Sequence, residues 1–100
     1  MRVALPHNLG REEVRRRMRE RSHEISDFFP GGLASVETAW SGEDRLNMTI
    51  DAMGQQIMGG IDIEDSQVVI EFDLPAALGM ARSLIERAVR KEGAKLLEKK

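Results

Sequence analysis

Residues 36–74 alternate between apolar and polar side chains in four short runs, and this alternation restricts the fold more than any other feature. A period of two places successive side chains on opposite faces of a strand, so each run predicts a strand with one buried face. The predicted strands are residues 36–40, 46–52, 57–64 and 67–74. Because turn-forming residues separate them, they indicate an antiparallel meander.

The two segments that flank this region repeat their apolar residues at helical spacing instead. Val14, Met18, Ile25 and Phe29 form one stripe along the arginine-rich segment that begins at Arg11. After Pro75 the stripe consists of Leu78, Ala81, Ile85, Ala88, Val89 and Leu96, with Leu84 at its border. A short apolar run at residues 3–5 adds a predicted edge strand. The order strand, helix, four strands, helix predicts an α+β fold, a two-layer sandwich with both helices on the apolar face of one antiparallel sheet.

The length and composition suit one domain without covalent cross-links. The 100 residues fit a single α+β domain over 1–100 that buries about two-thirds of its unfolded surface. The absence of cysteine excludes disulfides, thiolate catalysis and cysteine-based zinc sites. No apolar run approaches the roughly 20 residues of a membrane-spanning helix, and the N-terminal apolar segment is too short for a signal peptide. We therefore expect a cytoplasmic protein without a transmembrane segment.

Charge is segregated along the chain although the net charge is only −2. Residues 34–75 contain nine acids and one base, whereas residues 1–33 and 76–100 each carry an excess of bases. The acidic middle should repel polyanions such as nucleic acids.

The arginines of residues 11–21 do not alter this expectation. They are spread around the predicted helix, with Arg15, Arg16 and Arg19 on its solvent side. Four ion pairs are predicted from their spacing: Glu12–Arg16, Glu13–Arg17, Arg16–Glu20 and Arg21–Glu24. A nucleic-acid interface would gather bases on one face beside aromatic or polar readers. We interpret the segment as a self-neutralised surface helix and expect no nucleic-acid partner.

The histidines and acids of the sequence do not form a recognisable catalytic or metal-binding motif. The two histidines, His7 and His23, belong to no ligand pair or nucleophile–base pattern. Asp62, Glu64 and Asp65 form an acidic cluster, but they lack the ligand spacing and glycine of a calcium loop. We expect these carboxylates to solubilise the surface, and we expect no catalytic residue, no metal and no cofactor.

The remaining candidate is a contact surface of scattered apolar residues. It consists of Ala39, Met53, Met58 and Val69 on the outward face of the sheet, with Met80 and Leu97 outside the buried arc of the second helix. Methionine side chains provide an adaptable contact surface. The second helix is also amphipathic and rich in lysine, as interfacial anchors are. Core packing is the favoured interpretation of residues 76–90, where Gly79 predicts close packing against a neighbour, and both interpretations stay open beyond Gly93.

Four segments form a pattern that covers nearly the whole chain. They are HNLGREEVRRRM (7–18), WSGEDRLNM (40–48), MGGIDIEDSQVVIEFDLP (58–75) and LGMARSLIE (78–86). In this order they resemble the polyhydroxyalkanoic acid system family, small bacterial proteins whose genes lie with polyhydroxyalkanoate synthesis and granule genes. The resemblance implies an accessory role in polyester storage metabolism, with a granule or a granule-associated protein as partner. It carries over no catalytic residue.

Three functions follow as hypotheses. The first is a non-catalytic accessory protein of polyhydroxyalkanoate storage, which the resemblance implies. The second is a carrier of an acyl or lipid-like ligand, in which Gly59 and Gly60 bend a strand and open a cavity between the long helix and the curved sheet. The third is an enzyme, which would need His7 to meet acids of the sheet in a pocket.

Overall fold

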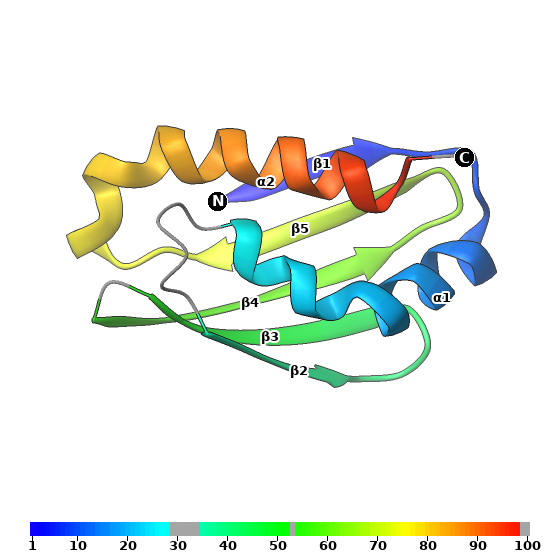
Figure 1. The fold of residues 1–100 in the computed structure, drawn as a ribbon, viewed down its shortest axis with the longest axis horizontal. Coiled ribbons are helices and arrows are strands. Elements are labelled where there is room, and N and C mark those ends of the chain that lie inside the picture. Colours follow the sequence, from blue (N-terminus) through cyan, green and yellow to red (C-terminus); the bar gives the residue numbers. More distant parts are fainter. Residues whose placement is uncertain (29–34, 53, 99–100) are drawn as a thin grey trace.

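The computed structural model describes residues 1–28, 35–52 and 54–98, which form one sheet covered by two helical segments. In chain order the elements are β1 (Arg2–Pro6), α1 (Arg11–Arg21), η1 (Ser22–Phe28), β2 (Ser35–Trp40), β3 (Arg45–Ala52), β4 (Gln55–Ile63), β5 (Gln67–Asp73), η2 (Ala76–Ala81) and α2 (Arg82–Leu96), where η denotes a 3-10 helix. Figure 1 shows both helical segments on the same side of the sheet. The predicted two-layer α+β architecture is confirmed.

All neighbouring strands of this sheet are antiparallel, in the order β1-β5-β4-β3-β2. The strands β2 to β5 form the predicted meander, and β1 pairs with β5 at the edge, as expected for residues 3–5. Gly42 and Gly54 adopt φ of 83° and 74° in the turns that flank β3. Glycine suits these positions because other residues rarely adopt positive φ.

The alternation of each strand directs one set of side chains into a shared core. In β3, Leu46, Met48, Ile50 and Ala52 are buried, whereas Asn47 and Asp51 on the other face of the strand are exposed. The helical layer closes this core with Val14, Met18, Ile25, Leu78, Ile85, Val89 and Leu96. Burying side chains of this size contributes about 1.5–3 kcal/mol each, so the two layers stabilise each other.

The first helical segment follows the predicted stripe, but its geometry changes at Ser22. The α-helix ends at Arg21 and continues as the 3-10 helix η1 through Phe28. Residues 22–28 include two serines, a histidine and an aspartate, which are weak helix formers. Phe29, the last residue of the predicted stripe, lies outside the described residues.

The second helical segment also combines both geometries, but in the reverse order. It starts as the 3-10 helix η2 and becomes the α-helix α2 at Arg82. Gly93 lies against the sheet: a Cβ there would be 2.5 Å from a methyl carbon of Leu5. The prediction that Leu97 lies outside the buried arc is wrong, since Leu97 is only 8% exposed. Leu97 is the C-cap residue that follows α2, and its backbone N–H donates to the carbonyl oxygen of Ala94. The regular α-helical spacing on which that prediction rested therefore does not determine where its side chain lies.

Three glycines differ from their predicted roles. A Cβ at Gly79 would meet nothing within 4 Å, so Gly79 does not mark close packing. At Gly59, a Cβ would lie 2.3 Å from the carbonyl oxygen of Glu71 and 2.8 Å from the ring of Phe72. At Gly60, it would lie 2.4 Å from the guanidinium of Arg45. The space beside Gly59 and Gly60 is therefore filled by neighbouring residues.

Candidate functional site

The large apolar side chains exposed in the described part of the chain are Met58, Met80 and Leu84. Met80 is fully exposed in η2, and Leu84 is 53% exposed one turn later in α2. Met58 is 55% exposed on the opposite side of the molecule, on the outward face of β4. The exposed apolar surface is therefore divided between the helical layer and the sheet.

The predicted contact surface is only partly brought to the exterior. Ala39, Met58 and Met80 are exposed, and Met53 lies outside the described residues. Val69 was expected on the outward face and has that register, but it is 1% exposed. It lies between Ala4 of β1 and Asp62 of β4 in the interior of the sheet. Val69 and Leu97 are thus corrected to buried residues and contribute no contact surface.

Sequence reasoning placed Leu84 at the border of the buried stripe and did not assign it to the contact surface. The structure exposes it four residues after Met80. Arg87 and Lys91 continue this spacing on the exposed side of α2. The spacing 80, 84, 87 and 91 is a helical stripe that the sequence itself contains.

The outward face of the sheet forms an open groove of about 870 Å³ that carries both charge signs. It is lined by residues that include Arg2, Arg45, Met58, Glu71, Asp73 and Arg82. The guanidinium of Arg45 passes over Gly60 and donates to the carboxylate of Asp62 at 2.8 Å. Arg2 lies 3.4 Å from Glu71. Since acids of this face already hold two of its arginines, the groove has no uniform charge for an ionic ligand.

The acidic cluster predicted at the β4–β5 turn is divided among separate partners. Asp62 pairs with Arg45, Asp65 accepts from Arg11 at 2.6 Å, and Glu64 accepts from the side-chain amide of Gln67 at 2.9 Å. Over the described residues, no group of three or more histidines and acids has a metal-holding arrangement. The cluster therefore provides surface contacts for the scaffold.

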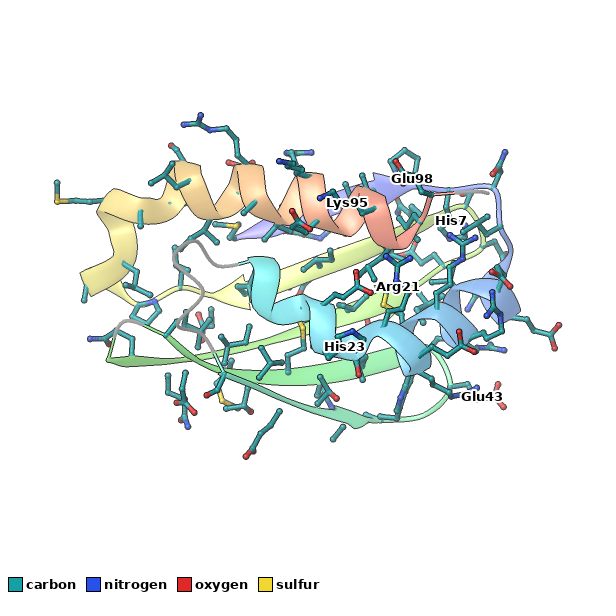
Figure 2. All side chains as sticks on the ribbon, in the orientation of Figure 1. His7, Arg21, His23, Glu43, Lys95 and Glu98 are labelled. Carbon is teal, nitrogen blue, oxygen red and sulfur yellow. The ribbon has the colours of Figure 1, made fainter. Side chains whose placement is uncertain are left out.

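The two histidines lie in different environments. Figure 2 shows His7 at the end of the sheet where β1 leaves it, and His23 on the first helical segment. Nδ1 of His7 accepts from the backbone N–H of Leu9 at 3.2 Å, and Nε2 lies 3.0 Å from the carbonyl oxygen of Glu64. The neutral tautomer with a proton on Nε2 satisfies both contacts. His7 thus joins the β1–α1 loop to the β4–β5 turn, while His23 is largely exposed.

The arginine-rich helix makes long-range contacts that its sequence did not reveal. Arg15 was expected on the solvent side, but its side chain is only 19% exposed and lies 2.7 Å from Asp44 in the β2–β3 turn. Arg11 donates to Asp44 at 2.6 Å and to Asp65 at the same distance. We call these four residues the arginine cluster. The hydrogen bond from Arg15 is the main cause that lowers the pKa of Asp44, and the hydrogen bond from Arg11 lowers it further.

Shorter-range ion pairs cover the exposed side of α1. Glu13 accepts from Arg16 and Arg17, and these hydrogen bonds lower its pKa to about 2. The predicted pairs Glu13–Arg17, Arg16–Glu20 and Arg21–Glu24 are confirmed. Arg16 pairs with Glu13 in place of the predicted Glu12. Arg19 lies over the ring of Trp40 at 5.2 Å, which links α1 to β2.

Two arginines of α1 bind the carboxyl end of α2. Arg17 donates to the carbonyl oxygens of Leu96, at 3.1 Å, and of Glu98. Arg21 lies 3.4 Å from the carbonyl oxygen of Lys95, and Figure 2 shows Arg21 between the two helices, near Lys95 and Glu98. The last carbonyls of a helix lack partners within the helix and carry partial negative charge, so cationic donors stabilise them. Part of the arginine excess therefore serves helix–helix packing.

One comparison with known proteins identifies a family. The family model described as "Putative polyhydroxyalkanoic acid system protein" matches residues 1–97. No curated protein and no solved structure matches the chain significantly. Within the described residues, no helix is both long enough and apolar enough to cross a membrane.

Proposed function

The chain belongs to the polyhydroxyalkanoic acid system protein family, and on this premise we propose that it is a non-catalytic accessory protein of polyhydroxyalkanoate storage in the cytoplasm. It acts at the polyester granule, through contact with the granule surface or with a granule-associated protein. The observation that carries this proposal is the family match, which extends over residues 1–97.

The hydrogen bonds that His7 and the acids at the β4–β5 turn already make support a role without catalysis. Both ring nitrogens of His7 contact backbone atoms, and Asp62, Glu64 and Asp65 hold three different partners. No polar or charged side chain in the described part of the chain is buried. Catalytic acids and bases usually combine burial with a charge partner in a cleft, and none of these side chains does so.

The carrier hypothesis has less support. It relied on Gly59 and Gly60 to open a cavity, but Phe72 and Arg45 occupy the space beside them. The core residues Ile61, Ile70 and Ile85 are at most 1% exposed. We expect native mass spectrometry of the mildly purified protein to give the mass of the polypeptide alone, and a bound lipid-like mass would favour the carrier.

Deletion of the gene in a polyester-accumulating host tests the proposed role. We expect the deletion to change granule number, granule size or polymer content, and we expect the wild-type gene to restore them. A Met80→Ser/Leu84→Ser variant provides a surface-specific comparison because both side chains are exposed. Unchanged granules and polymer content in the deletion strain would reject the role in storage.

A further inference from the structure

The outward side of the helical layer combines exposed apolar residues with bases on one stripe. Met80 and Leu84 are followed at helical spacing by Arg87 and Lys91, and all four are exposed. The buried stripe of the same helix, which includes Ile85 and Val89, faces the sheet. We call the four exposed residues the docking face, and we propose that it binds an anionic phospholipid surface.

The apolar part of the docking face lies at the end of the molecule. No charged residue occurs between Asp73 and Arg82, and η2 lies within this uncharged stretch. Figure 1 shows η2 at one end of the helical layer, where the chain turns from β5 toward α2. Met80 is fully exposed there, so its side chain can enter a lipid interface without displacing any core residue.

The basic part of the docking face is not neutralised by the residues that the structure describes. Neither Arg87 nor Lys91 makes an ion pair with any residue that the structure describes. The neighbouring acids are already occupied: Glu86 accepts from Arg90 at 3.3 Å, and Glu92 accepts from Lys95 at 3.4 Å. Two cations next to two apolar side chains match the chemistry of an anionic phospholipid headgroup above its acyl chains.

The opposite side of the molecule has the opposite charge character. Glu37, Asp51 and Asp73 are exposed on the outward side of the sheet and make no ion pair within the described ranges. Two of the three arginines that line the groove on that face, Arg2 and Arg45, are held by Glu71 and Asp62. An anionic surface would repel these acids and attract the docking face, so the charge distribution selects the orientation with the helices toward the surface.

A lipid surface fits this geometry better than a protein groove. Met80 and Leu84 lie one helical turn apart on the outward side of the helical layer, so their exposed side chains form a projecting stripe. Such a stripe would need a closely complementary groove in a protein partner, whereas a fluid headgroup layer adapts to it. The inference rests on the proposed function only for its cellular setting, because the surface chemistry follows from this chain.

Flotation of the purified protein with vesicles tests the inference. We expect binding to vesicles of equal parts phosphatidylglycerol and phosphatidylcholine, and little binding to phosphatidylcholine alone. Met80→Ser/Leu84→Ser should weaken binding by at least about tenfold through the lost apolar insertion. Arg87→Glu/Lys91→Glu should weaken it at least as much through reversed charge. Met58→Ser is the control from the opposite face, because Met58 is 55% exposed, close to the 53% of Leu84, and its loss should leave binding unchanged.

Circular dichroism and Tm establish that the variants are folded, as expected for exposed positions. The proposal is overturned if the wild-type protein binds neither vesicle, or binds both equally. It is also overturned if Met58→Ser weakens binding as much as Met80→Ser/Leu84→Ser. Self-association that Met80→Ser/Leu84→Ser abolishes, without vesicle binding, would instead identify the docking face as an interface between two copies. All these results are independent of the deletion phenotype, so this inference and the proposed function can fail separately.

Discussion

Asp44 connects the helical layer to the sheet at the level of single side chains. It follows Gly42 and Glu43 in the β2–β3 turn and accepts hydrogen bonds from Arg11 and Arg15 of α1. Two cationic donors on one carboxylate restrict that turn and the start of the helix together. The turn is therefore specified by tertiary contacts as well as by its own residues.

We predict that Asp44→Asn lowers Tm by a few degrees. The amide preserves the size of the side chain but removes the charge that Arg11 and Arg15 share. Glu43→Gln is the matched control, since Glu43 is 81% exposed and lies 3.6 Å from Arg15. Thermal unfolding of both variants should show a clear decrease for Asp44→Asn and almost none for Glu43→Gln. Equal decreases would show that the arginine cluster is no more than ordinary surface charge.

The depressed pKa values of the carboxylates predict acid sensitivity. The pKa of Glu13 is about 2 in the folded protein and has an ordinary value of 4.5, and those of Glu24 and Asp44 are also lowered. Because the folded pKa is the lower one, the stabilisation is complete above about pH 5 and is lost as the pH falls toward 2. Tm measured across this range should fall, and Glu13→Gln should show a smaller fall. A Glu13→Gln profile parallel to that of the wild type would contradict this assignment.

At the scale of elements, Arg17 holds the two helices together. Its side chain is only 13% exposed and reaches from α1 to the last carbonyls of α2. We predict that Arg17→Met costs about 1–3 kcal/mol, because cationic hydrogen bonds to these carbonyls are lost while the apolar stem is kept. Hydrogen exchange should accelerate in the last turn of α2. Arg16→Met should leave that exchange unchanged, because Arg16 pairs with Glu13 and Glu20 of its own helix.

The β4–β5 pairing depends on the small size of Gly59. We predict that Gly59→Ala destabilises the protein by about 1–3 kcal/mol, since its Cβ would clash with the backbone oxygen of Glu71 and the ring of Phe72. Gly79→Ala makes the same chemical change where nothing lies within 4 Å, and it should be neutral or slightly stabilising. Denaturant titration measures both. An equally stable Gly59→Ala protein would show that this strand pair is loosely packed.

Local patterns predicted the elements well but predicted their contacts poorly. Period-two alternation located the strands because one face of each is buried, as in β3. Helical stripes identified Val14, Ile85 and Val89 as core residues for the same reason. Contacts between residues distant in sequence, such as Arg15 with Asp44, depend on how the helical layer lies on the sheet. The periodic pattern within one segment contains no information about that placement. Val69 and Leu97 were misjudged because their burial depends on the position of β5 in the sheet and on the end of α2.

At the scale of the whole molecule, the charge segregation of the sequence becomes a difference between two faces. Acids of the sheet turns bind Arg11 and Arg15 of α1, and acids that pair with no described residue remain on the outward side of the sheet. Exposed apolar residues and bases without an ion pair to any described residue remain on η2 and α2. A small two-layer domain thereby presents two chemically different sides, which suits a protein that works by attaching to a surface in one orientation.

The most direct test of this account is the distribution of the tagged protein in fractionated cells, with and without polyester accumulation. We expect the protein to move into the granule fraction when polyester accumulates, and we expect Met80→Ser/Leu84→Ser to remain in the supernatant while Met58→Ser follows the wild type. A protein that stays in the supernatant in accumulating cells would contradict the account.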